Sequence, residues 1–597
     1  MATITIPTFG GEVPRTTPRL LEATQAQRAV NCDLRRGALE ALRLPAKRHE
    51  LAATALSIFK HRQDGWLAWP NVVNVVKSAV IDAEGDKPLG HLFLTGARAY
   101  PTQYLAGGEE YRLGIPRPGA APLVAVARGA VEKTVACYAW GADSDSQIPP
   151  RYGYEDTLAP IREDNVSVAA FAASASEEPE SSPTDSGIGR SSAYCYTLVQ
   201  SLADGIFQQE SAPSPPSEVV DVLDGDGVTL SGFEIPEVDG LKVTHIRLYR
   251  TQSGEKTSEF HFLAELPVPV ASYLDTTHDA DLSTLVLQTT TWDCIPDDAR
   301  GLIVADNGIY AAFRGNELLI SEPNYAYVFP ADYRLVVEDQ IVALGHTDNT
   351  IVVLTTGRPY LATGSDPGQM QLTHLPIEQS CVSARSVGSL PGGVVYASPD
   401  GLMLFTASDQ SLVSGQTFTR DQWQELGPQN LMGTVLDGKY IGFFAGTRHG
   451  LIYSVGAKDI VRVELPKGWQ VRALYHHSVD DCIYLSIDTP EGSGVYQWEA
   501  GAPMRYTWRS KPFFFSALTA MSAVRIEGEQ TGGDPVDVTI FGPDAEYPRS
   551  MLEIRSTRTA RITATRAEKL WSLEIQGTAT VYEARLGGSV EGVEYGA

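Results

Sequence analysis

A unit of two short apolar runs joined by a turn recurs five times between Ile309 and Trp498. Successive copies start 42 to 46 residues apart, at Ile309, Ile351, Val394, Tyr440 and Cys482. The turns are rich in Gly, Asn, Asp and Pro, which tight reversals between strands favour. A repeat of about 40 to 50 residues with several strands is typical of a β-propeller blade, because a small sheet covers both its faces only by stacking around an axis. The sequence therefore predicts an all-β protein built around a β-propeller.

Residues 55–116 carry the same strand pattern ahead of the repeats and are expected to form a first blade segment. The main propeller is expected at 291–513, with about six blades in total and five or seven as alternatives. Early and late strands often join in one blade to close the ring, so we expect the early segment beside the last hairpin.

The segment 117–290 interrupts the propeller with short alternating strands at about ten-residue spacing. This spacing favours an inserted β-sandwich of the fibronectin III or immunoglobulin kind. Within it, residues 171–187 are polar and rich in Pro and Ser, which predicts a mobile loop.

Both ends of the chain differ from the repeats. Residues 1–54 predict an extended, proline-pinned arm with a short helix near 23–30. The arm is expected to lie on its own domain or, the favoured alternative, on a neighbouring subunit. Residues 514–597 contain further strand patterns and predict a small C-terminal β-domain.

The composition limits the cellular setting. The 597 residues are 43% hydrophobic, yet no apolar run reaches the roughly 20 residues of a membrane span. The first residues lack the pattern of a secretory signal, and the six cysteines are scattered without CxxC spacing. We therefore expect a chain made and folded in the cytoplasm, with free thiols and no membrane span.

The charge is strongly acidic, with 47 basic and 73 acidic residues and a net charge of −26. Such a chain repels phosphate, which disfavours a DNA clamp but suits the wall of a DNA-conducting pore. The simpler interpretation, which we favour, is that the acidity gives solubility. Locally basic positions are candidate docking residues for an acidic partner or DNA, unless they form solvated faces paired with nearby acids. They are Arg15, Arg19, Arg555, Arg558, Arg561 and Arg566.

The sequence predicts no catalytic, cofactor or metal site. Gly433 to Tyr440 fits most of a phosphate-binding loop, but ends in Tyr and reads as strand, turn, strand. His476 and His477 are adjacent, so on a strand they point to opposite faces. Asp224 to Gly227 lacks the remaining ligands of a calcium loop. Among 73 acids a carboxylate pair for glycoside hydrolysis stays open.

Several phrases of the sequence resemble the tail nozzle (tail tubular) proteins of short-tailed double-stranded-DNA bacteriophages. The resemblance spans most of the chain apart from about Val135 to Ser186. The phrases are Phe9-Gly-Gly with Pro14-Arg15 and Pro18-Arg19, Asn307 to Asn316 followed by Ser321-Glu-Pro323, Tyr396 to Gly401, Trp508 to Pro512, Glu210 to Ser214 and Leu248 to Thr251.

This resemblance implies a structural virion protein and not an enzyme. Several copies, with six as the expected number, would form a ring at the end of the phage tail, below a tail adaptor protein. The ring would gate and conduct genomic DNA, with transient contacts to it, and would carry tail fibres or spikes. The rival readings are a host-glycan-binding or fibre-attachment propeller and, less favoured, a polysaccharide hydrolase.

Overall fold

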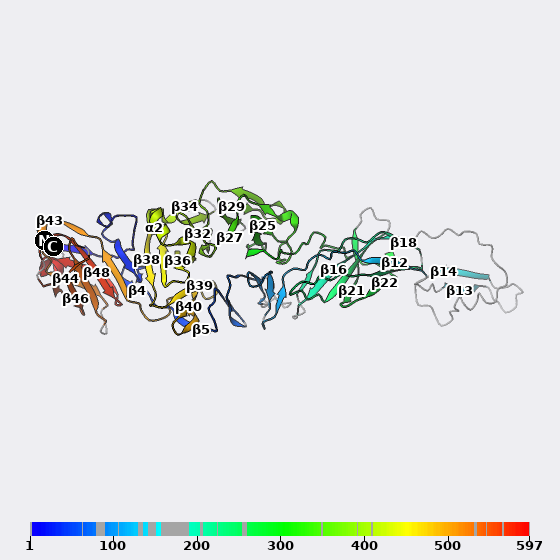
Figure 1. Cartoon of the computed structure of the whole chain (residues 1–597), viewed down its shortest axis with the longest axis horizontal. Coiled ribbons are helices and arrows are strands. Elements are labelled where there is room, and N and C mark those ends of the chain that lie inside the picture. Colours follow the sequence, from blue (N-terminus) through cyan, green and yellow to red (C-terminus); the bar gives the residue numbers. More distant parts are fainter. Residues whose placement is uncertain are drawn as a thin grey trace. The chain divides into compact units, whose positions relative to one another are not determined.

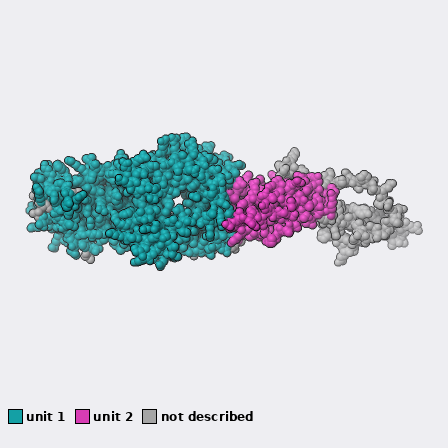
Figure 2. Space-filling model, in the orientation of Figure 1, with its two compact units in different colours: residues 1–113, 295–597 teal, residues 114–294 magenta. Residues whose placement is uncertain are grey.

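The computed structural model divides the chain into two compact units, residues 1–113 with 295–597 and residues 114–294 (Figure 2). The predicted mobile loop at 171–187 lies outside the described residues. In strands 135–140 and 151–156 only the backbone is described. The structure describes residues 3–595 except 63, 79–89, 106, 129–134, 141–150, 157–189, 203–206, 224, 253–258, 348–349, 391, 407–409, 530–533, 545 and 564–565.

Six blades of four antiparallel strands form the propeller of the first unit; five are separate sheets, and blade 5 is part of a larger sheet (Figure 1). Blade 1 contains β8 (Asn74–Lys77), β9 (Leu92–Thr95), β10 (Thr102–Tyr104) and β11 (Glu110–Arg112). Blade 2 contains β23 (Arg300–Val304), β24 (Tyr310–Arg314), β25 (Glu317–Ile320) and β26 (Leu335–Val336). Blade 3 contains β27 (Ile341–Thr347), β28 (Thr350–Thr355), β29 (Tyr360–Thr363) and β30 (Gln371–His374).

The remaining blades follow in chain order. Blade 4 contains β31 (Gly388–Leu390), β32 (Gly393–Ser398), β33 (Gly401–Thr406) and β34 (Gln410–Leu412). A short helix, α2 (Arg420–Glu425), precedes blade 5, which contains β35 (Leu431–Leu436), β36 (Lys439–Phe444), β37 (His449–Ser454) and β38 (Asp459–Glu464). Blade 6 contains β39 (Gln470–His477), β40 (Cys482–Thr489), β41 (Gly492–Gln497) and, from the other end of the chain, β5 (Ala46–Leu51).

The sequence repeat corresponds to the two middle strands of blades 2 to 6. In blade 3, for example, β28 pairs with β29 and Ile351 lies opposite Ala362. The run from Ile351 to Leu354 is fully buried on both faces of the sheet. Such a run lacks polar alternation because the neighbouring blades cover both faces, as the shared apolar clusters of blades 2 with 3 and 3 with 4 show.

The blades follow one another around a ring through their first strands. Strand β8 lies against β23, and the contacts continue through β27, β31 and β35 to β39. The hairpin of β6 (Ser57–His61) and β7 (Gly65–Trp69) contacts β39 and shares an apolar cluster with blade 1. The prediction of a β-propeller with about six blades is confirmed, and the two-stranded hairpin is a smaller seventh member of the ring.

The predicted helix near 23–30 is wrong, because this segment forms strand β2 (Ala26–Val30). Ala26, Ala29 and Val30 are buried, and β2 pairs with β38 of blade 5 on one side and with β42 (Tyr506–Ser510) on the other. Packing between two sheets outweighs the helix propensity of Ala and Gln. Of the two positions expected for the arm, the structure shows the less favoured one, on its own unit. Strands β2 and β5 belong to sheets of this chain.

The C-terminal β-domain is confirmed and contains two sheets around a common core. One sheet contains β42, β48 (Glu568–Gly577), β45 (Val536–Phe541) and β46 (Pro548–Ile554), with β43 (Phe513–Thr519) also on β48. The other contains β1 (Thr3–Ile6), β49 (Val581–Gly587), β44 (Ala523–Gly528) and β47 (Ala560–Arg561), followed by helix α3 (Val590–Tyr595). Through β2, the first sheet continues into blade 5 as a ten-stranded sheet.

The second unit is the predicted inserted β-sandwich, described here by itself. One sheet has the order β17 (Gln208–Glu210), β16 (Tyr194–Ser201), β20 (His245–Thr251), β21 (Phe260–Pro267). The facing sheet has the order β12 (Leu123–Ala127), β19 (Gly227–Ser231), β22 (Ser272–Asp275). Two strand pairs complete the unit, β15 (Arg190–Ser192) with β18 (Val220–Val222) and β13 (Val135–Trp140) with β14 (Arg151–Asp156). Side chains such as Tyr196, Leu248 and Leu230 fill the space between the sheets.

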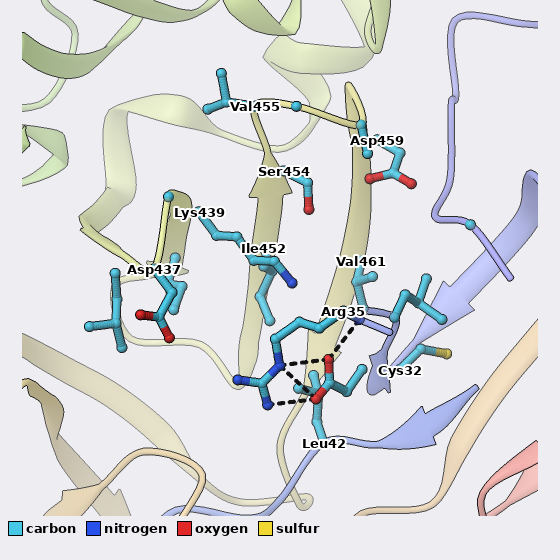
Figure 3. Close-up of a pocket in the computed structure, with 18 of the residues that line it drawn as sticks. Cys32, Arg35, Leu42, Asp437, Lys439, Ile452, Ser454, Val455, Asp459 and Val461 are labelled. Carbon is cyan, nitrogen blue, oxygen red and sulfur yellow. Dashed lines mark hydrogen bonds and ion pairs between the residues drawn. The ribbon is translucent and has the colours of Figure 1, made fainter. Parts of the chain in front are cut away.

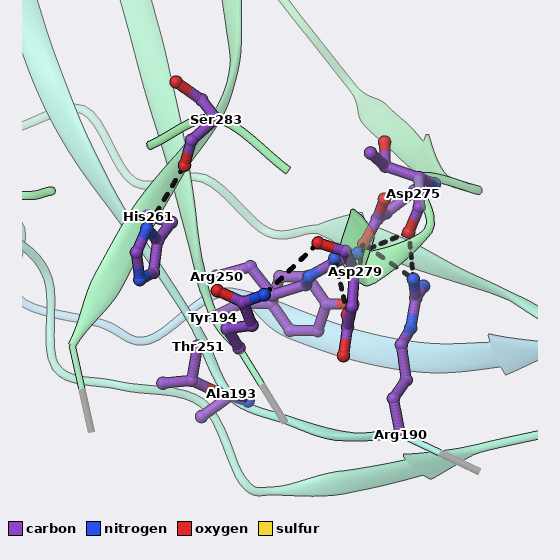
Figure 4. A network of polar contacts seen from close by, with 11 residues as sticks. Arg190, Ala193, Tyr194, Arg250, Thr251, His261, Asp275, Asp279 and Ser283 are labelled. Atoms are coloured by element: carbon purple, nitrogen blue, oxygen red, sulfur yellow. Dashed lines mark hydrogen bonds and ion pairs between the residues drawn. The ribbon is translucent and has the colours of Figure 1, made fainter. Parts of the chain in front are cut away.

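A buried ionic network links the two sheets of the sandwich (Figure 4). The fully buried Arg250 guanidinium lies 2.7 Å from Asp275 and 2.9 Å from Asp279. Asp275 also accepts hydrogen bonds from the Tyr194 hydroxyl at 2.9 Å and from the Thr277 N–H at 2.9 Å. Burial by itself raises the pKa of Asp275, but Arg250 and these donors outweigh burial and hold that pKa below its usual value. The carboxylate is therefore charged in the folded sandwich.

No helix in the described part of the chain is long and apolar enough to span a membrane.

The network yields a stability prediction. Asp275→Asn removes the fully buried carboxylate that pairs with both Arg250 and Arg190, and only the partly exposed Asp279 then remains beside Arg250. We therefore expect the sandwich to lose about 3 to 5 kcal/mol of unfolding free energy at pH 7. Because the pKa of Asp275 is lowered on folding, its contribution is present above the unfolded pKa of about 3.9 and is lost as the pH falls through the folded pKa. Thermal unfolding from pH 7 to pH 3 measures this.

The matched control is Asp281→Asn, at an exposed position of the same unit that makes no ion pair among the described residues. Its stability should match that of the natural protein at every pH. A gap between Asp275→Asn and the natural protein that stays constant down to pH 3 would contradict the assignment.

Candidate functional site

The N-terminal arm is fixed to the rest of its unit at a joint formed by Phe9, Gly10 and Gly11. The Phe9 ring packs edge-on against Trp508, with 4.9 Å between ring centroids, and the Trp508 indole N–H donates to the Gly10 carbonyl at 2.9 Å. The Gly11 N–H donates to the Asp459 carboxylate at 2.6 Å. A Cβ atom on Gly11 would lie 2.5 Å from the Ile460 carbonyl oxygen, so this position accepts only glycine without a backbone shift. The Phe-Gly-Gly phrase is thus required by close packing.

Glu12 continues the joint as a buried acid. Its backbone N–H donates to the Ile460 carbonyl at 2.7 Å, and its side chain accepts from the Ala29 N–H at 2.8 Å and from Arg462 Nε at 2.8 Å. Burial raises the pKa of Glu12, and the Arg462 guanidinium opposes that rise. One side chain therefore connects the arm, β2 and β38, where an unpaired buried carboxylate would be costly.

A cavity of about 380 Å³ lies beside this joint, between the arm and blades 5 and 6 (Figure 3). Its floor is apolar and includes Phe9, Leu42, Ile452, Val461 and Trp498. Its charged residues come from the arm, from the turns of blade 5 and from the end of blade 6. They are Asp33, Arg35, Asp437, Lys439, Asp459 and Glu499.

The charges of this cavity are largely engaged with one another. Arg35 Nε donates to both Asp33 carboxylate oxygens, at 2.9 and 2.8 Å, and the Arg35 guanidinium lies 3.7 Å from Glu499. Burial raises the pKa of Glu499 and lowers the pKa of Lys439, whose side chain extends toward Arg35 in Figure 3. The Cys32 thiol is buried and its pKa is raised well above the usual range. This arrangement can hold a small polar molecule and fix the arm, but it presents no activated nucleophile.

A second cavity, of about 650 Å³, lies where β6, β8 and β39 end. We call it the basic cavity. Its charged and imidazole side chains are Lys60, His61, Arg62, Lys77, His91 and His477. The described residues that line it include no Asp or Glu, in contrast to the first cavity and to the acidic chain as a whole.

The predicted docking arginines fall into separate groups. Arg15 is held on the propeller, where its guanidinium donates to the Gly415 carbonyl at 2.5 Å. The Arg19 guanidinium lies 5.4 Å from the centre of the Phe514 ring of the C-terminal domain.

The four C-terminal arginines lie between the starts of β46 and β48. Arg555 pairs with Glu553, whereas Arg558, Arg561 and Arg566 are exposed and make no ion pair with any described residue. The structure brings these four onto the C-terminal domain, where Arg19 also lies against Phe514, and holds Arg15 on the propeller.

The motifs that resembled phosphate-binding or metal-binding sites in the sequence form strands, turns and ion pairs. Gly433 lies in β35, and Lys439 begins β36 after a two-residue turn, so the loop-like phrase is strand, turn, strand as predicted. His477 contacts Asp480 and His476 contacts Asp481 in two separate pairs. In the described part of the chain, no three His, Cys, Asp or Glu side chains are arranged to hold a metal ion. Asp224 lies outside the described residues.

Sequence reasoning missed both cavities. Their side chains come from segments far apart in the chain, for example Lys60, Lys77 and His477 in the basic cavity. The one local signal is that these cations and imidazoles directly follow short apolar strand patterns, at the ends of strands. Nothing in the sequence indicates that the three strand ends meet.

Comparisons with known proteins give similar solved structures but no family. No protein-family model matches the sequence, and no curated protein matches it. Solved structures that are similar include the Pan2 WD40 domain of Neurospora crassa, at 10% identity over 47% of this chain and 83% of that one, with a TM-score of 0.25. YCF48 from Cyanidioschyzon merolae matches at 10% identity over 47% of this chain and 98% of that one, with a TM-score of 0.24. At such scores the fold assignment rests on the blade pairings themselves.

The joint yields the second prediction. Trp508→Ala removes a fully buried indole and its hydrogen bond to Gly10, so we expect the first unit to lose about 3 to 5 kcal/mol of unfolding free energy. Denaturant unfolding followed by circular dichroism measures the loss. The control Tyr547→Ala truncates an exposed aromatic of the same domain and should change stability by less than about 0.5 kcal/mol. Equal effects of the two substitutions would show that the joint does not stabilise the unit.

Proposed function

We propose that this chain is a structural protein of a bacteriophage tail, the nozzle subunit of a ring that gates and conducts DNA at the distal end. The resemblance noted in the sequence motivates the proposal. The observation that carries it is the joint, where two phrases of that resemblance, Phe9-Gly-Gly and the segment around Trp508, contact each other. Close packing at a joint between domains suits a protein whose role is mechanical.

The mechanical argument rests on how the first unit is connected. A ring that holds pressurised DNA must not hinge between its domains. Strand β2 is paired with both blade 5 and the C-terminal sheet, so the propeller and the C-terminal domain share one continuous sheet. An interface made of backbone hydrogen bonds and a common apolar core resists such bending better than a flexible linker.

The charge supports a conduit. With a net charge of −26, the chain repels a polyanion at long range, which lowers the retention of DNA that moves past it. A protein that must release DNA quickly benefits from this repulsion. A DNA clamp would not benefit from this repulsion, because it must hold DNA.

The proposal includes the partners of the ring. The chain would assemble as a homo-oligomer, with six copies, in the virion tail. It would bind the tail adaptor protein and carry fibres or spikes, and DNA would contact it transiently. The exposed Arg558, Arg561 and Arg566 of the C-terminal domain, with Arg555 beside them, are the proposed docking residues for an acidic surface of the adaptor.

Microscopy tests this function directly. Purified protein, alone and mixed with the tail adaptor, should give closed rings with a central opening in negative stain, and mass photometry should give six copies per ring. Monomers at every concentration that bind host glycan, or release sugar from it, would contradict the nozzle assignment and favour the rival propeller functions.

Charge-reversal variants of the C-terminal domain test the proposed contact with the adaptor. Arg558→Glu with Arg566→Glu should weaken adaptor binding and leave the fold intact, because both side chains are exposed. Lys467→Glu changes an exposed cation on the connection between β38 and β39 and should leave adaptor binding unchanged.

A further inference from the structure

We propose that the cavity of about 380 Å³ beside the joint, which we call the joint cavity, binds one unit of a neutral hexose sugar. A hexose ring fits this volume, and the described residues that line it all belong to the first unit. The segments that supply these residues, 9–10, 32–42, 436–461 and 498–499, are described without a gap. The inference rests on this cavity and stands independently of the proposed tail function.

Three polar groups of the joint cavity have no hydrogen-bond partner among the described residues. The Trp498 side chain is only 5% exposed, and its indole N–H is buried without an acceptor. The Glu499 carboxylate accepts no hydrogen bond from a described residue, and its ion pair with Arg35 spans 3.7 Å. The Lys439 ammonium forms neither a hydrogen bond nor an ion pair with a described residue. Because buried polar groups in folded proteins are nearly always paired, two donors and an acceptor left over in one cavity indicate a missing partner.

The backbone of Glu499 adopts an uncommon conformation at the edge of this cavity. Its φ of +54° lies in the left-handed region, which a residue other than glycine rarely adopts and which costs free energy. Burial raises the pKa of Glu499 and lowers the pKa of Lys439, so the neighbouring charges do not fully offset the loss of water around either group. A strained residue that carries an incompletely paired charge is typical of a site that recognises a ligand.

The charges of the joint cavity disfavour an ionic ligand. Its described lining residues carry four carboxylates and two cations, Arg35 and Lys439. The carboxylates repel an anion, whereas Lys439, whose side chain extends toward Arg35 in Figure 3, repels a metal ion or an amine. A hydroxyl group both donates and accepts, so a neutral hydroxylated ligand can donate to Glu499 and accept from Lys439 and Trp498.

The apolar floor favours a sugar over water alone. The rings of Phe9 and Trp498 and the side chains of Leu42, Ile452 and Val461 line the cavity. The carbon–hydrogen face of a sugar ring can pack on such a surface, while its hydroxyls reach the few polar groups around it, which is the usual composition of a small-molecule site. The sugar is a free hexose or the terminal hexose of a polysaccharide, since both present the same ring and hydroxyls.

Isothermal titration tests the site with D-glucose, D-galactose and D-mannose as free hexoses and with dextran as a polysaccharide of glucose. We expect the natural protein to bind at least one of these probes, and Lys439→Met or Glu499→Gln to weaken that binding about tenfold or more. Because burial disfavours the Lys439 ammonium, Lys439→Met should not lower the melting temperature. The control Lys467→Met removes an exposed cation outside the cavity and should bind like the natural protein.

The probes distinguish the two sources of the sugar. Tighter binding of dextran than of glucose, lost in Lys439→Met and Glu499→Gln, assigns the site to a polysaccharide end, whereas binding of a free hexose alone assigns it to a free sugar. The inference is overturned if no probe binds at tens of millimolar hexose, or if both cavity variants bind as well as Lys467→Met.

Lysine acetylation read by peptide mass spectrometry keeps the test available should a cavity variant fail to fold. In the natural protein, the bound sugar should slow acetylation of Lys439 and leave that of the exposed Lys467 unchanged. Equal acetylation of Lys439 with and without sugar would overturn the inference. Ring assembly is measured separately by microscopy, so failure here is distinct from failure of the nozzle assignment, and rings that bind sugar satisfy both proposals.

Discussion

The first unit depends on the pairing of β2 with strands on both of its sides. Val30 lies opposite Arg462 in parallel pairing with β38, and Ala29 lies opposite Trp508 in antiparallel pairing with β42. On the β42 edge four residue pairs form the ladder, whereas on the β38 edge Val30 pairs alone. Glu12 bridges the rest of that edge, since its backbone exchanges hydrogen bonds with Ile460 and its carboxylate accepts from the Ala29 N–H. The propeller and the C-terminal domain become one hydrogen-bonded body in this way.

Two more strands from the N-terminal segment complete sheets made of C-terminal strands. β5 is the outer strand of blade 6, with Leu51 opposite Ser493, and β1 lies on β49, with Thr3 opposite Gly587. Each pairing joins residues more than 400 positions apart. Such contacts are slow to form, because the chain must close very long loops before they contribute, so the unit completes its fold only after the C-terminal strands exist.

Elements that depend on the local sequence pattern were predicted correctly, whereas elements that depend on pairing with distant segments were missed. The middle hairpins of blades 2 to 6 were visible because runs such as Ile351 to Leu354 are apolar without alternation, as expected for strands covered on both faces. β2 was predicted as a helix, since Ala and Gln favour helices and nothing local signals the two sheets that enclose it. β5 was missed as a blade strand because four of its six residues are exposed, as on an outer edge. Its place in blade 6 follows only from pairing with β41.

The candidate sites show the same limit. The predicted docking arginines near the C-terminus share one domain because they are close in sequence, whereas Arg15 is held by its own propeller. The basic cavity needs three strand ends that only ring closure brings together, so no spacing in the sequence reveals it. The continuous sheet through β2 and the basic cavity thus both depend on contacts between segments that are far apart in the chain.

Hydrogen–deuterium exchange of β2 tests the central claim most directly. If β2 joins the propeller to the C-terminal domain, the amides of Ala26 to Val30 should exchange as slowly as those of β38 and β42. All three strands should then open together in one cooperative event. Exchange of β2 within seconds, while β38 and β42 stay protected, would contradict the account.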